Sequence, residues 1–293
     1  MYFYALKFSE MRKIFSIVIA CSFIAGLSSC NKEDKTVNET INGFDIQWNG
    51  RFDNKEDRNV IRDMIRDLVY VEGGSFMMGD TLNDALANEG PVHKVNISDF
   101  YIGKTEVTQE LWETIMDTEC GDDASGEWDG NYGHGDKYPA YRVSYSNALD
   151  FIDKLHDITG LKFDLPTEAQ WEYAARGGKS TTYKKYAGSD KYEDVAVTNE
   201  NHSKCSVVAS KSPNELGLYD MSGNVWEMCR DWYADYTEAE VTDPECTEYG
   251  DGYKVFRGGS WNNPARYARV TTRYKQGIHY QDYQTGFRLV IVK

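Results

Sequence analysis

The stretch that decides the fold reads NELGLYDMSGNVWE and occupies residues 214–227. Glycine, asparagine, aspartate and aromatic residues dominate here and in the rest of the chain beyond about residue 180, and helical periodicity is lost. Two short segments of similar character follow it, RGGSW at 257–261 and GFRL at 286–289. We therefore expect the C-terminal part to consist of short strands and long ordered loops.

Upstream of this stretch, LPTEAQWEYAARGG at residues 165–178 predicts a helix. Thr167 and Gln170 have the spacing of a capping box, in which each side chain satisfies an unpaired amide at the helix start. The two glycines at 177–178 end the helix.

Three further helices are predicted from apolar residues at helical spacing. One covers 54–67, and a second begins after Thr108, a good N-cap. The third covers 144–156 and carries four apolar residues on one face, namely Leu149, Phe151, Ile152 and Leu155.

Short strands are expected at 69–72, 75–78, 92–97 and 100–103. The first two are separated by Gly73 and Gly74, which predict a tight turn and hence a β-hairpin. No repeat of fixed period is visible. We expect one domain covering residues 54–293, with the helix at 54–67 as its lead-in.

The N-terminus predicts export. Residues 1–29 are interpreted as a signal peptide whose true start is Met11, because a short basic segment begins there and an apolar segment follows. LSSC at 27–30 resembles the lipobox of bacterial lipoproteins, which predicts lipidation, including palmitate, on Cys30. The lipid would tie the chain to a membrane without a spanning helix.

Residues 30–53 are polar and aperiodic, so we expect a lipidated acidic tether there. The segment NKED at 31–34 resembles the charged signal that sends lipoproteins of Bacteroidetes-type bacteria to the outer face of the cell; a plain solvated tether is the alternative. The expected location is the cell envelope, as an outer-membrane lipoprotein that is exposed at the surface.

Composition excludes one class of partner. The formal net charge is −15 and the pI is near 4.8. Such a surface repels phosphate backbones, so nucleic acid is not an expected partner. Four cysteines follow the tether, Cys120, Cys205, Cys229 and Cys246, and in an oxidising compartment they could form up to two disulfides.

Taken together and in order, the segments GGSFMMG (73–79), KTEVT (104–108), LPTEAQWEYAARGG, NELGLYDMSGNVWE, RGGSW and GFRL resemble the formylglycine-generating enzyme family, also called the sulfatase-modifying factor family. The resemblance spans residues 68–291. It implies an α+β fold that is related to C-type lectins and is poor in regular secondary structure.

The family's enzymes oxidise a cysteine of a sulfatase to formylglycine, and two active-site thiols hold copper(I). The matching positions lie at or near Asn263 and Ala265, and no cysteine follows Cys246. Copper(I) prefers soft thiolates, so we expect neither copper nor the family's oxidase chemistry. Trp226 and Ser260 match other pocket residues of the family, or serve as a core aromatic and a turn residue. The five histidines are scattered and do not indicate an iron site.

The resemblance also implies one structural Ca²⁺ site. Carried over by position, Asp220 and Glu227 supply side-chain oxygens, while Gly223 and Val225 supply carbonyl oxygens; such hard donors suit Ca²⁺. In the alternative, the loop is tied by hydrogen bonds alone. The acidic loop at 117–136 is expected to be a solvated insertion.

We expect a binding or scaffold module rather than an enzyme, with a protein or glycan as ligand. The segment 261–285 carries aromatic and polar residues of the kind that make adaptable contacts, and it resembles the variable region of lectin-fold proteins diversified by retroelements. The candidate ligand-binding residues are Trp261, Asn262, Asn263, Arg266, Tyr267 and Arg269, with Tyr274, Tyr280 and Tyr283 nearby. The alternative is a sulfatase-modifying or related oxygen-dependent enzyme with non-standard ligands.

Overall fold

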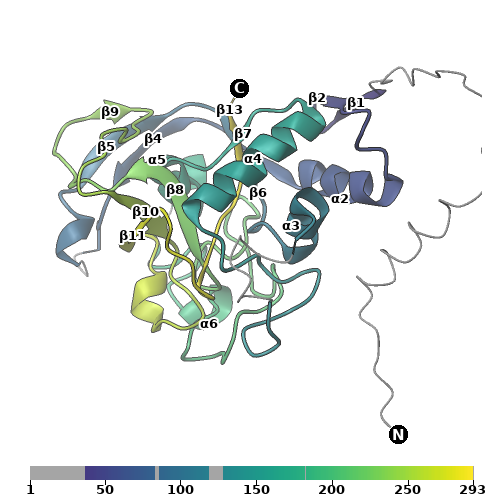
Figure 1. Cartoon of the computed structure of the whole chain (residues 1–293). Coiled ribbons are helices and arrows are strands. Elements are labelled where there is room, and N and C mark those ends of the chain that lie inside the picture. Colours follow the sequence, from purple (N-terminus) through teal and green to yellow (C-terminus); the bar gives the residue numbers. More distant parts are fainter. Residues whose placement is uncertain (1–36, 83–85, 119–127, 182, 293) are drawn as a thin grey trace, which may run out of the picture. The chain divides into compact units, whose positions relative to one another are not determined.

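A computed structural model describes residues 37–82, 86–118, 128–181 and 183–292. The expectations for the signal peptide, Met11, Cys30 and the NKED segment lie outside the described residues, as do Cys120 and residues 119–127 of the acidic loop. Within them the structure is α+β, as expected, with few helices and many short strands (Figure 1).

The strands are mostly three to five residues long. Their bounds are β1 Val37–Ile41, β2 Phe44–Trp48, β3 Leu68–Val71, β4 Gly74–Met78, β5 His93–Ile97, β6 Phe100–Gly103, β7 Phe163–Asp164, β8 Trp226–Trp232, β9 Val241–Thr242, β10 Tyr253–Arg257, β11 Arg273–Gly277, β12 Thr285–Gly286 and β13 Val290–Val292. The helices are α2 Lys55–Arg66, α3 Gln109–Met116, α4 Tyr145–Thr159, α5 Glu168–Ala175 and α6 Tyr192–Val195. Short 3₁₀ turns lie at Ala87–Glu89, Gly178–Ser180 and Ala265–Ala268.

The strands form four small sheets. Their orders are β11-β10-β8-β12, β3-β6-β13-β7, β4-β5-β9 and the hairpin β1-β2. Strand β8 lies inside the first sheet, antiparallel to β10 and parallel to β12. This sheet therefore brings the motif that contains Trp226 beside the C-terminal segment before GFRL.

The predicted helices are confirmed, and their caps explain where they begin. Thr167 accepts a hydrogen bond from the Gln170 amide and the Gln170 side chain accepts one from the Thr167 amide, so both halves of the capping box are present. Thr108 caps α3. One detail of α4 was wrong: Leu149 lies on the exposed face of this helix, whereas Phe151 is buried.

The hairpin predicted at Gly73-Gly74 is wrong, although both strands exist. Strand β3 pairs with β6, while β4 pairs with β5 in a different sheet. A Cβ on Gly73 would lie 2.4 Å from the carbonyl oxygen of Ile97, and neither glycine has a positive φ. The glycine permits a close approach of two backbones rather than a turn.

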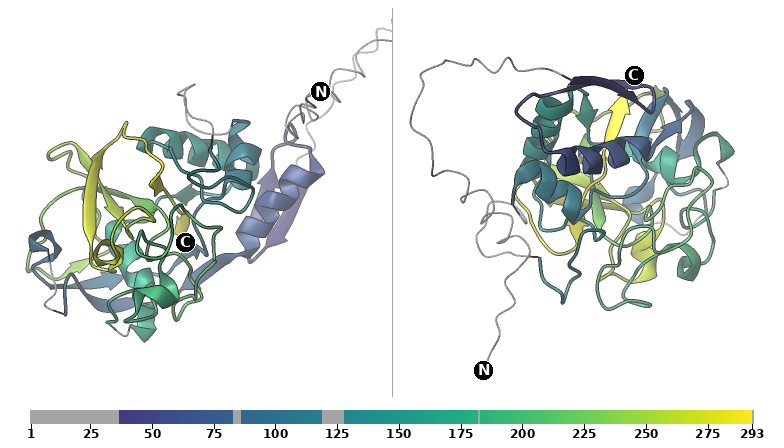
Figure 2. Two further views of the ribbon diagram at one scale, coloured as in Figure 1. Left: turned by 90° about the horizontal axis from the view of Figure 1, so that it is seen from below. Right: turned by 90° about the vertical axis from the view of Figure 1, so that its right-hand side faces the viewer.

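Part of the expected tether is folded. Residues 37–48 form the hairpin β1-β2, in which Ile46 and Trp48 are fully buried. Trp48 Nε1 donates to Glu39, and the guanidinium of Arg62 lies 5.3 Å from the Trp48 ring centre. This hairpin packs beside α2 and α4 (Figure 2), because its alternating apolar side chains need a surface to cover them.

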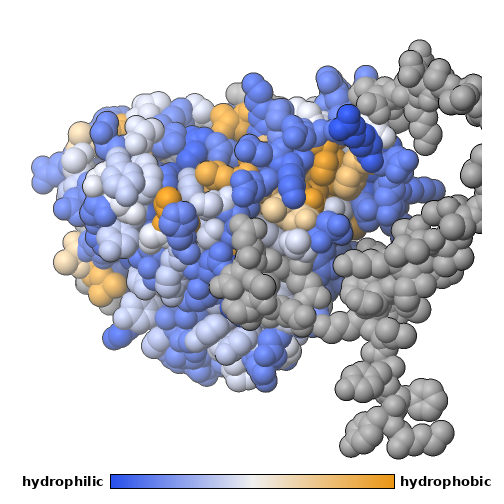
Figure 3. Space-filling view, viewed as in Figure 1, coloured by the Kyte–Doolittle hydropathy of each residue, from blue (hydrophilic) through white to orange (hydrophobic). Residues whose placement is uncertain are grey.

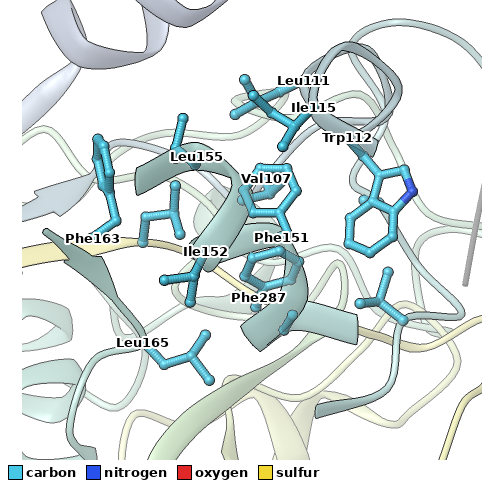
Figure 4. Packing of buried hydrophobic residues seen from close by; sticks show 14 of the residues in the cluster. Val107, Leu111, Trp112, Ile115, Phe151, Ile152, Leu155, Phe163, Leu165 and Phe287 are labelled. Carbon is cyan, nitrogen blue, oxygen red and sulfur yellow. The ribbon is translucent and has the colours of Figure 1, made fainter. Parts of the chain in front are cut away.

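The aromatic core lies between α3 and α4. Trp112 stacks on Phe151 with ring centres 5.5 Å apart, and Phe287 meets Phe151 edge-on at 5.4 Å. Figure 4 shows Leu111 and Ile115 of α3 on the same side of this group. Phe287 belongs to GFRL, so its packing in this core holds residues 286–289 in place.

A second interior feature is a network of buried ions around α5. Glu168 accepts from Arg257 at 2.7 Å and from Arg273 at 2.6 Å, and Glu172 accepts from Arg257 at 2.6 Å and from Arg176 at 2.8 Å. Burial alone raises the pKa of Glu168, but Arg273 and Arg257 outweigh it and lower that pKa to about 2. These ion pairs are structural, because they tie α5 to β10 and β11.

The face shown in Figure 3 is largely hydrophilic, with apolar colour confined to small patches. Among the described residues, no helix has the length and apolar character needed to cross a membrane.

Candidate functional site

A sharp loop positions Trp226 at the start of β8. Gly223 has φ +80° and Asn224 has φ +62°, and a Cβ on Gly223 would lie 2.2 Å from the Val197 carbonyl oxygen. Only glycine fits there. The Trp226 amide then donates to the Gln284 carbonyl at 2.6 Å, which fixes the ring against the C-terminal segment.

A pocket of about 270 Å³ opens beside this ring. Its walls come from three separate segments: β8, the loop after RGGSW, and the stretch from β11 to β12. The lining residues are Trp226, Asn263, Tyr267, Tyr274, Tyr280, Asp282, Gln284 and Thr285.

Hydrogen bonds hold the polar wall of the pocket. Asn263 Oδ1 accepts from Trp226 Nε1 at 2.8 Å and from Ser260 Oγ at 2.6 Å. Ser260 Oγ also lies 3.0 Å from Gln284 Oε1. Ser260 is fully buried, so it supports Asn263 from behind rather than facing the pocket.

The opposite wall is aromatic and carries one carboxylate. Tyr274 stacks on Trp226 with ring centres 5.0 Å apart. Tyr280 donates its hydroxyl to Asp282 Oδ2 at 2.8 Å, and Gln284 Nε2 donates to the same oxygen at 3.2 Å. Burial and the bond to Asp282 raise the pKa of Tyr280, so its phenol stays protonated.

None of the described cysteines lines this pocket, and all three are free thiols. Cys205 packs in the core with Trp226 and Trp261, and its thiol lies 2.6 Å from the Tyr132 carbonyl oxygen. Cys229 packs in the other large core cluster. Burial raises the pKa of both thiols, so both are protonated in the folded chain.

We expect the three thiols to differ in reactivity. Cys205 and Cys229 are buried, whereas Cys246 is half-buried, so of these three thiols iodoacetamide at pH 8 should label Cys246 alone in the native protein. Peptide mass mapping before and after unfolding reads the result. Rapid native labelling of Cys205 or Cys229 would contradict the packing described.

Residues 54–293 match the model of the sulfatase-modifying factor enzyme 1-like domain, known as FGE-sulfatase. The chain belongs to this family. The fold expected from the resemblance to sulfatase-modifying factors is thereby confirmed. A solved structure of Treponema denticola variable protein 1 is similar over 87% of this chain and 98% of its own, with a TM-score of 0.65 and 26% identity.

Relatives within the sulfatase-modifying factor family carry different names. The chain is 28% identical to "Chaperone protein LppX" of Paenibacillus barcinonensis, over 70% of this chain and 82% of the relative. It is 28% identical to "Formylglycine-generating enzyme" of Streptomyces coelicolor, over 67% and 79%. It is 27% identical to "Inactive C-alpha-formylglycine-generating enzyme 2" of Bos taurus, over 75% and 86%. Similarity alone therefore does not decide activity, and the site must.

Three of the four positions carried over from the sulfatase-modifying factor family meet in the pocket region. Trp226 and Asn263 line it, and Ser260 contacts Asn263. Ala265 does not: it is buried in a separate small cluster with Tyr186 and Val195. Ala265 is the first residue of the short 3₁₀ helix Ala265–Ala268, and this helix packs against the segment 186–196.

The candidate ligand-binding residues divide in the same way. Asn263 and Tyr267 line the pocket, and Asn262 and Arg266 are exposed beside it. Arg266 stacks on the Tyr267 ring at 4.8 Å.

Two of these candidates are structural instead. Trp261 is buried and donates Nε1 to the Tyr283 carbonyl at 3.0 Å. Arg269 is buried in an ion pair with Glu89 at 2.5 Å. Neither side chain is free to contact a ligand.

Asp282, Gln284 and Thr285 line the pocket although sequence reasoning did not select them. The sequence offered only their place directly before GFRL; the pairing of Thr285 and Gly286 with Trp226 and Glu227, the last two residues of the NELGLYDMSGNVWE motif, is visible in the fold alone.

The residues expected to hold calcium lie in a buried acidic cluster. Glu227 accepts from Arg288 and, at 2.7 Å, from Trp171 Nε1, while Asp220 accepts from the Ala209 amide at 2.7 Å. Glu106 lies beside them, and its Oε2 has no hydrogen-bond partner among the described residues. Burial raises the pKa of Asp220 to about 6.

This cluster fits a divalent cation by charge. Three carboxylates, Glu106, Asp220 and Glu227, face one guanidinium, Arg288. Burial and the neighbouring carboxylates raise the pKa of Glu106, and burial raises the pKa of Asp220, so protons offset part of the negative charge where no cation is bound. Among the described residues, no three His, Cys, Asp or Glu side chains form a metal-binding group. A calcium ion here would therefore need the backbone carbonyls of Gly223 and Val225 as well as Asp220 and Glu227.

Proposed function

We propose that this chain is a non-catalytic binding module of the cell envelope, and that the pocket around Trp226 receives its ligand. The proposal rests on one observation: this chain has an asparagine amide in the region where the family's enzymes have a copper-binding cysteine thiol. By the resemblance, Asn263 stands at or near a position that matches a copper thiol, and its Oδ1 accepts hydrogen bonds from Trp226 and Ser260. Amide oxygens and phenols do not replace thiolates around copper(I), whereas they are common in ligand pockets.

One assay distinguishes this non-catalytic module from the alternative, an oxygen-dependent enzyme with non-standard ligands. The purified domain is incubated with a Cys-x-Pro-x-Arg peptide, copper(I) and oxygen, with an active formylglycine-generating enzyme as the positive control. We expect the peptide mass to stay unchanged. Conversion of the peptide thiol to an aldehyde, detected by mass spectrometry, would reject the non-catalytic assignment.

Pocket binding is tested with a matched pair of variants. Tyr274 lines the pocket and Tyr253 lies outside it on the neighbouring strand β10, yet their exposed fractions are nearly equal, 42% and 41%. In pull-downs from envelope extracts and on a glycan array, Tyr274→Leu should lose the partner that the native domain retains. Tyr253→Leu should keep it. Equal behaviour of the two variants would place binding elsewhere.

We further propose export and anchoring through a lipid on Cys30, which would put the module at the outer membrane. The support is the lipobox-like LSSC at 27–30 after a short apolar segment. In the native organism, Cys30→Ser should move the protein from the membrane fraction to the soluble envelope fraction and abolish palmitate labelling. Unchanged fractionation would refute the lipid anchor.

We also propose that Asp220 and Glu227, with the carbonyls of Gly223 and Val225, hold one structural Ca²⁺. Bound calcium would balance the excess charge of the acidic cluster and hold the loop that leads to Trp226. At about 100 times its dissociation constant, calcium should raise the free energy of unfolding by about 2.7 kcal/mol. Thermal unfolding in the presence of calcium and of EDTA measures this change. Identical unfolding curves would show that calcium does not stabilise the fold and would refute the proposed site.

A further inference from the structure

The pocket around Trp226 has an unusual combination of side chains. Four of its eight lining residues are aromatic, namely Trp226, Tyr267, Tyr274 and Tyr280. Of the described residues that line it, Asp282 is the one with a charge, and none is lysine, arginine or histidine. The pocket is therefore a concave aromatic surface with a negative pole.

Its polar groups are largely satisfied by one another. Asn263 Oδ1 accepts from Trp226 and Ser260, and Gln284 Nε2 donates to Asp282. A ligand that needs many hydrogen bonds, such as a sugar, would have to break these contacts, and each buried group left unpaired costs about 1–3 kcal/mol. The pocket therefore suits a ligand that its aromatic rings and the Asp282 carboxylate can attract without new hydrogen bonds.

A methylated ammonium group meets that requirement. Its charge is spread over methyl groups that form no strong hydrogen bond, and it is attracted to the faces of aromatic rings and to a nearby carboxylate. Arg266 already covers one face of Tyr267, and Trp226 and Tyr274 stack on each other, so the attraction would come from Tyr280 and from the ring surfaces of Trp226 and Tyr274 that this stack leaves open. The chain's net charge of −15 adds a favourable long-range field.

The geometry points to a site for a quaternary or trimethylated ammonium head group, with Asp282 as its counter-charge. This inference rests on the proposed binding function and names its ligand class. The volume of about 270 Å³ suits a head group, because pockets for drug-sized ligands enclose about 300–1,000 Å³. Free choline or betaine, a choline phosphodiester and a trimethylated lysine all present this group.

Isothermal titration of the folded domain with choline tests the inference. The control ligand is 3,3-dimethylbutan-1-ol, which has the same shape and no charge. We expect choline to bind about tenfold more tightly than the neutral analogue, since cation–π attraction to partly exposed rings contributes about 0.5–1 kcal/mol and the carboxylate of Asp282 adds to it. Equal affinity of the two, or no binding of choline, would overturn the inference.

Further titrations separate the sources of the group. Glycine betaine, phosphatidylcholine vesicles and trimethyl-lysine amide are compared with choline on the same protein. Preference for one of them identifies the carrier, because the pocket contact is shared and only the attached chemistry differs. Binding of unmethylated lysine amide as tightly as the trimethylated form would contradict recognition of the methyl groups.

Two variants locate the site. Asp282→Asn keeps shape but removes charge, and Tyr274→Leu removes one aromatic face; each should weaken choline about tenfold, while Tyr253→Leu should leave it unchanged. Circular dichroism of each variant checks folding. If choline fails to bind but Tyr274→Leu still loses an envelope partner, the ammonium inference falls and the proposed binding function stands; if neither is seen, both fall.

Discussion

Replacing Arg288 by methionine is expected to lower the free energy of unfolding by about 3–5 kcal/mol. The guanidinium is fully buried and pairs with both oxygens of Glu227 at 2.5 Å. It also donates to the carbonyl oxygens of Gly103 and Tyr219, each at 3.0 Å. Methionine fills similar space but leaves Glu227 beside Glu106 and Asp220 with no buried cation.

Urea unfolding followed by tryptophan fluorescence measures this loss. The matched control is Arg66→Met, because Arg66 pairs with Asp63 at 2.6 Å on the surface, where both side chains are more than half exposed. Surface pairs contribute only about 0–1 kcal/mol. Equal losses in the two variants would show that burial of the Arg288 pair does not govern its contribution.

Replacing Glu168 by glutamine is expected to cost stability in a pH-dependent way. The folded pKa of Glu168, about 2, lies below its ordinary value of 4.5. A depressed carboxyl pKa stabilises the fold above pH 4.5, and that contribution disappears as pH falls through about 2. The shift corresponds to about 3 kcal/mol.

The native protein is therefore expected to have a higher free energy of unfolding than Glu168→Gln at pH 7. This difference between the two proteins should be about 3 kcal/mol larger at pH 7 than at pH 2. Chemical unfolding at both pH values gives the two differences. Using the difference between variants cancels the titration of groups that do not interact with Glu168. A difference that does not change with pH would contradict the ion network around α5.

Local chemistry made the helices predictable. The capping box of Thr167 and Gln170 and the N-cap of Thr108 act within one helical turn, so their effect can be read from neighbouring residues. The alternation of Phe44, Ile46 and Trp48 is also typical of a strand in the hairpin at 37–48. We did not predict this strand, because the surrounding segment is mostly polar.

Long-range contacts explain the errors. Gly73 predicts a turn when only its neighbours are considered, yet the Ile97 backbone, far along the chain, is what requires a glycine. Arg269 resembles a surface contact residue until Glu89, 180 residues away, is found beside it. Nothing in the neighbouring sequence encodes these partners.

The pocket was only partly predictable for the same reason. The resemblance marked Trp226, Ser260 and Asn263, because the first two lie within quoted motifs and Asn263 follows RGGSW by two residues. The carboxylate of Asp282 joins them through the pairing of β12 with β8, which no local pattern reveals. The ligand chemistry we infer depends on this residue, so it follows from the fold rather than from the motifs.

The most direct test of the central claim is a copper(I) titration of the reduced, folded domain against a chromogenic copper chelator. The account predicts that the chelator keeps the copper, because the pocket around Trp226 offers an amide where sulfur would be needed. Retention of one copper ion per chain, lost when Cys205 or Cys229 is replaced by serine, would contradict it and return an oxygen-using enzyme to consideration.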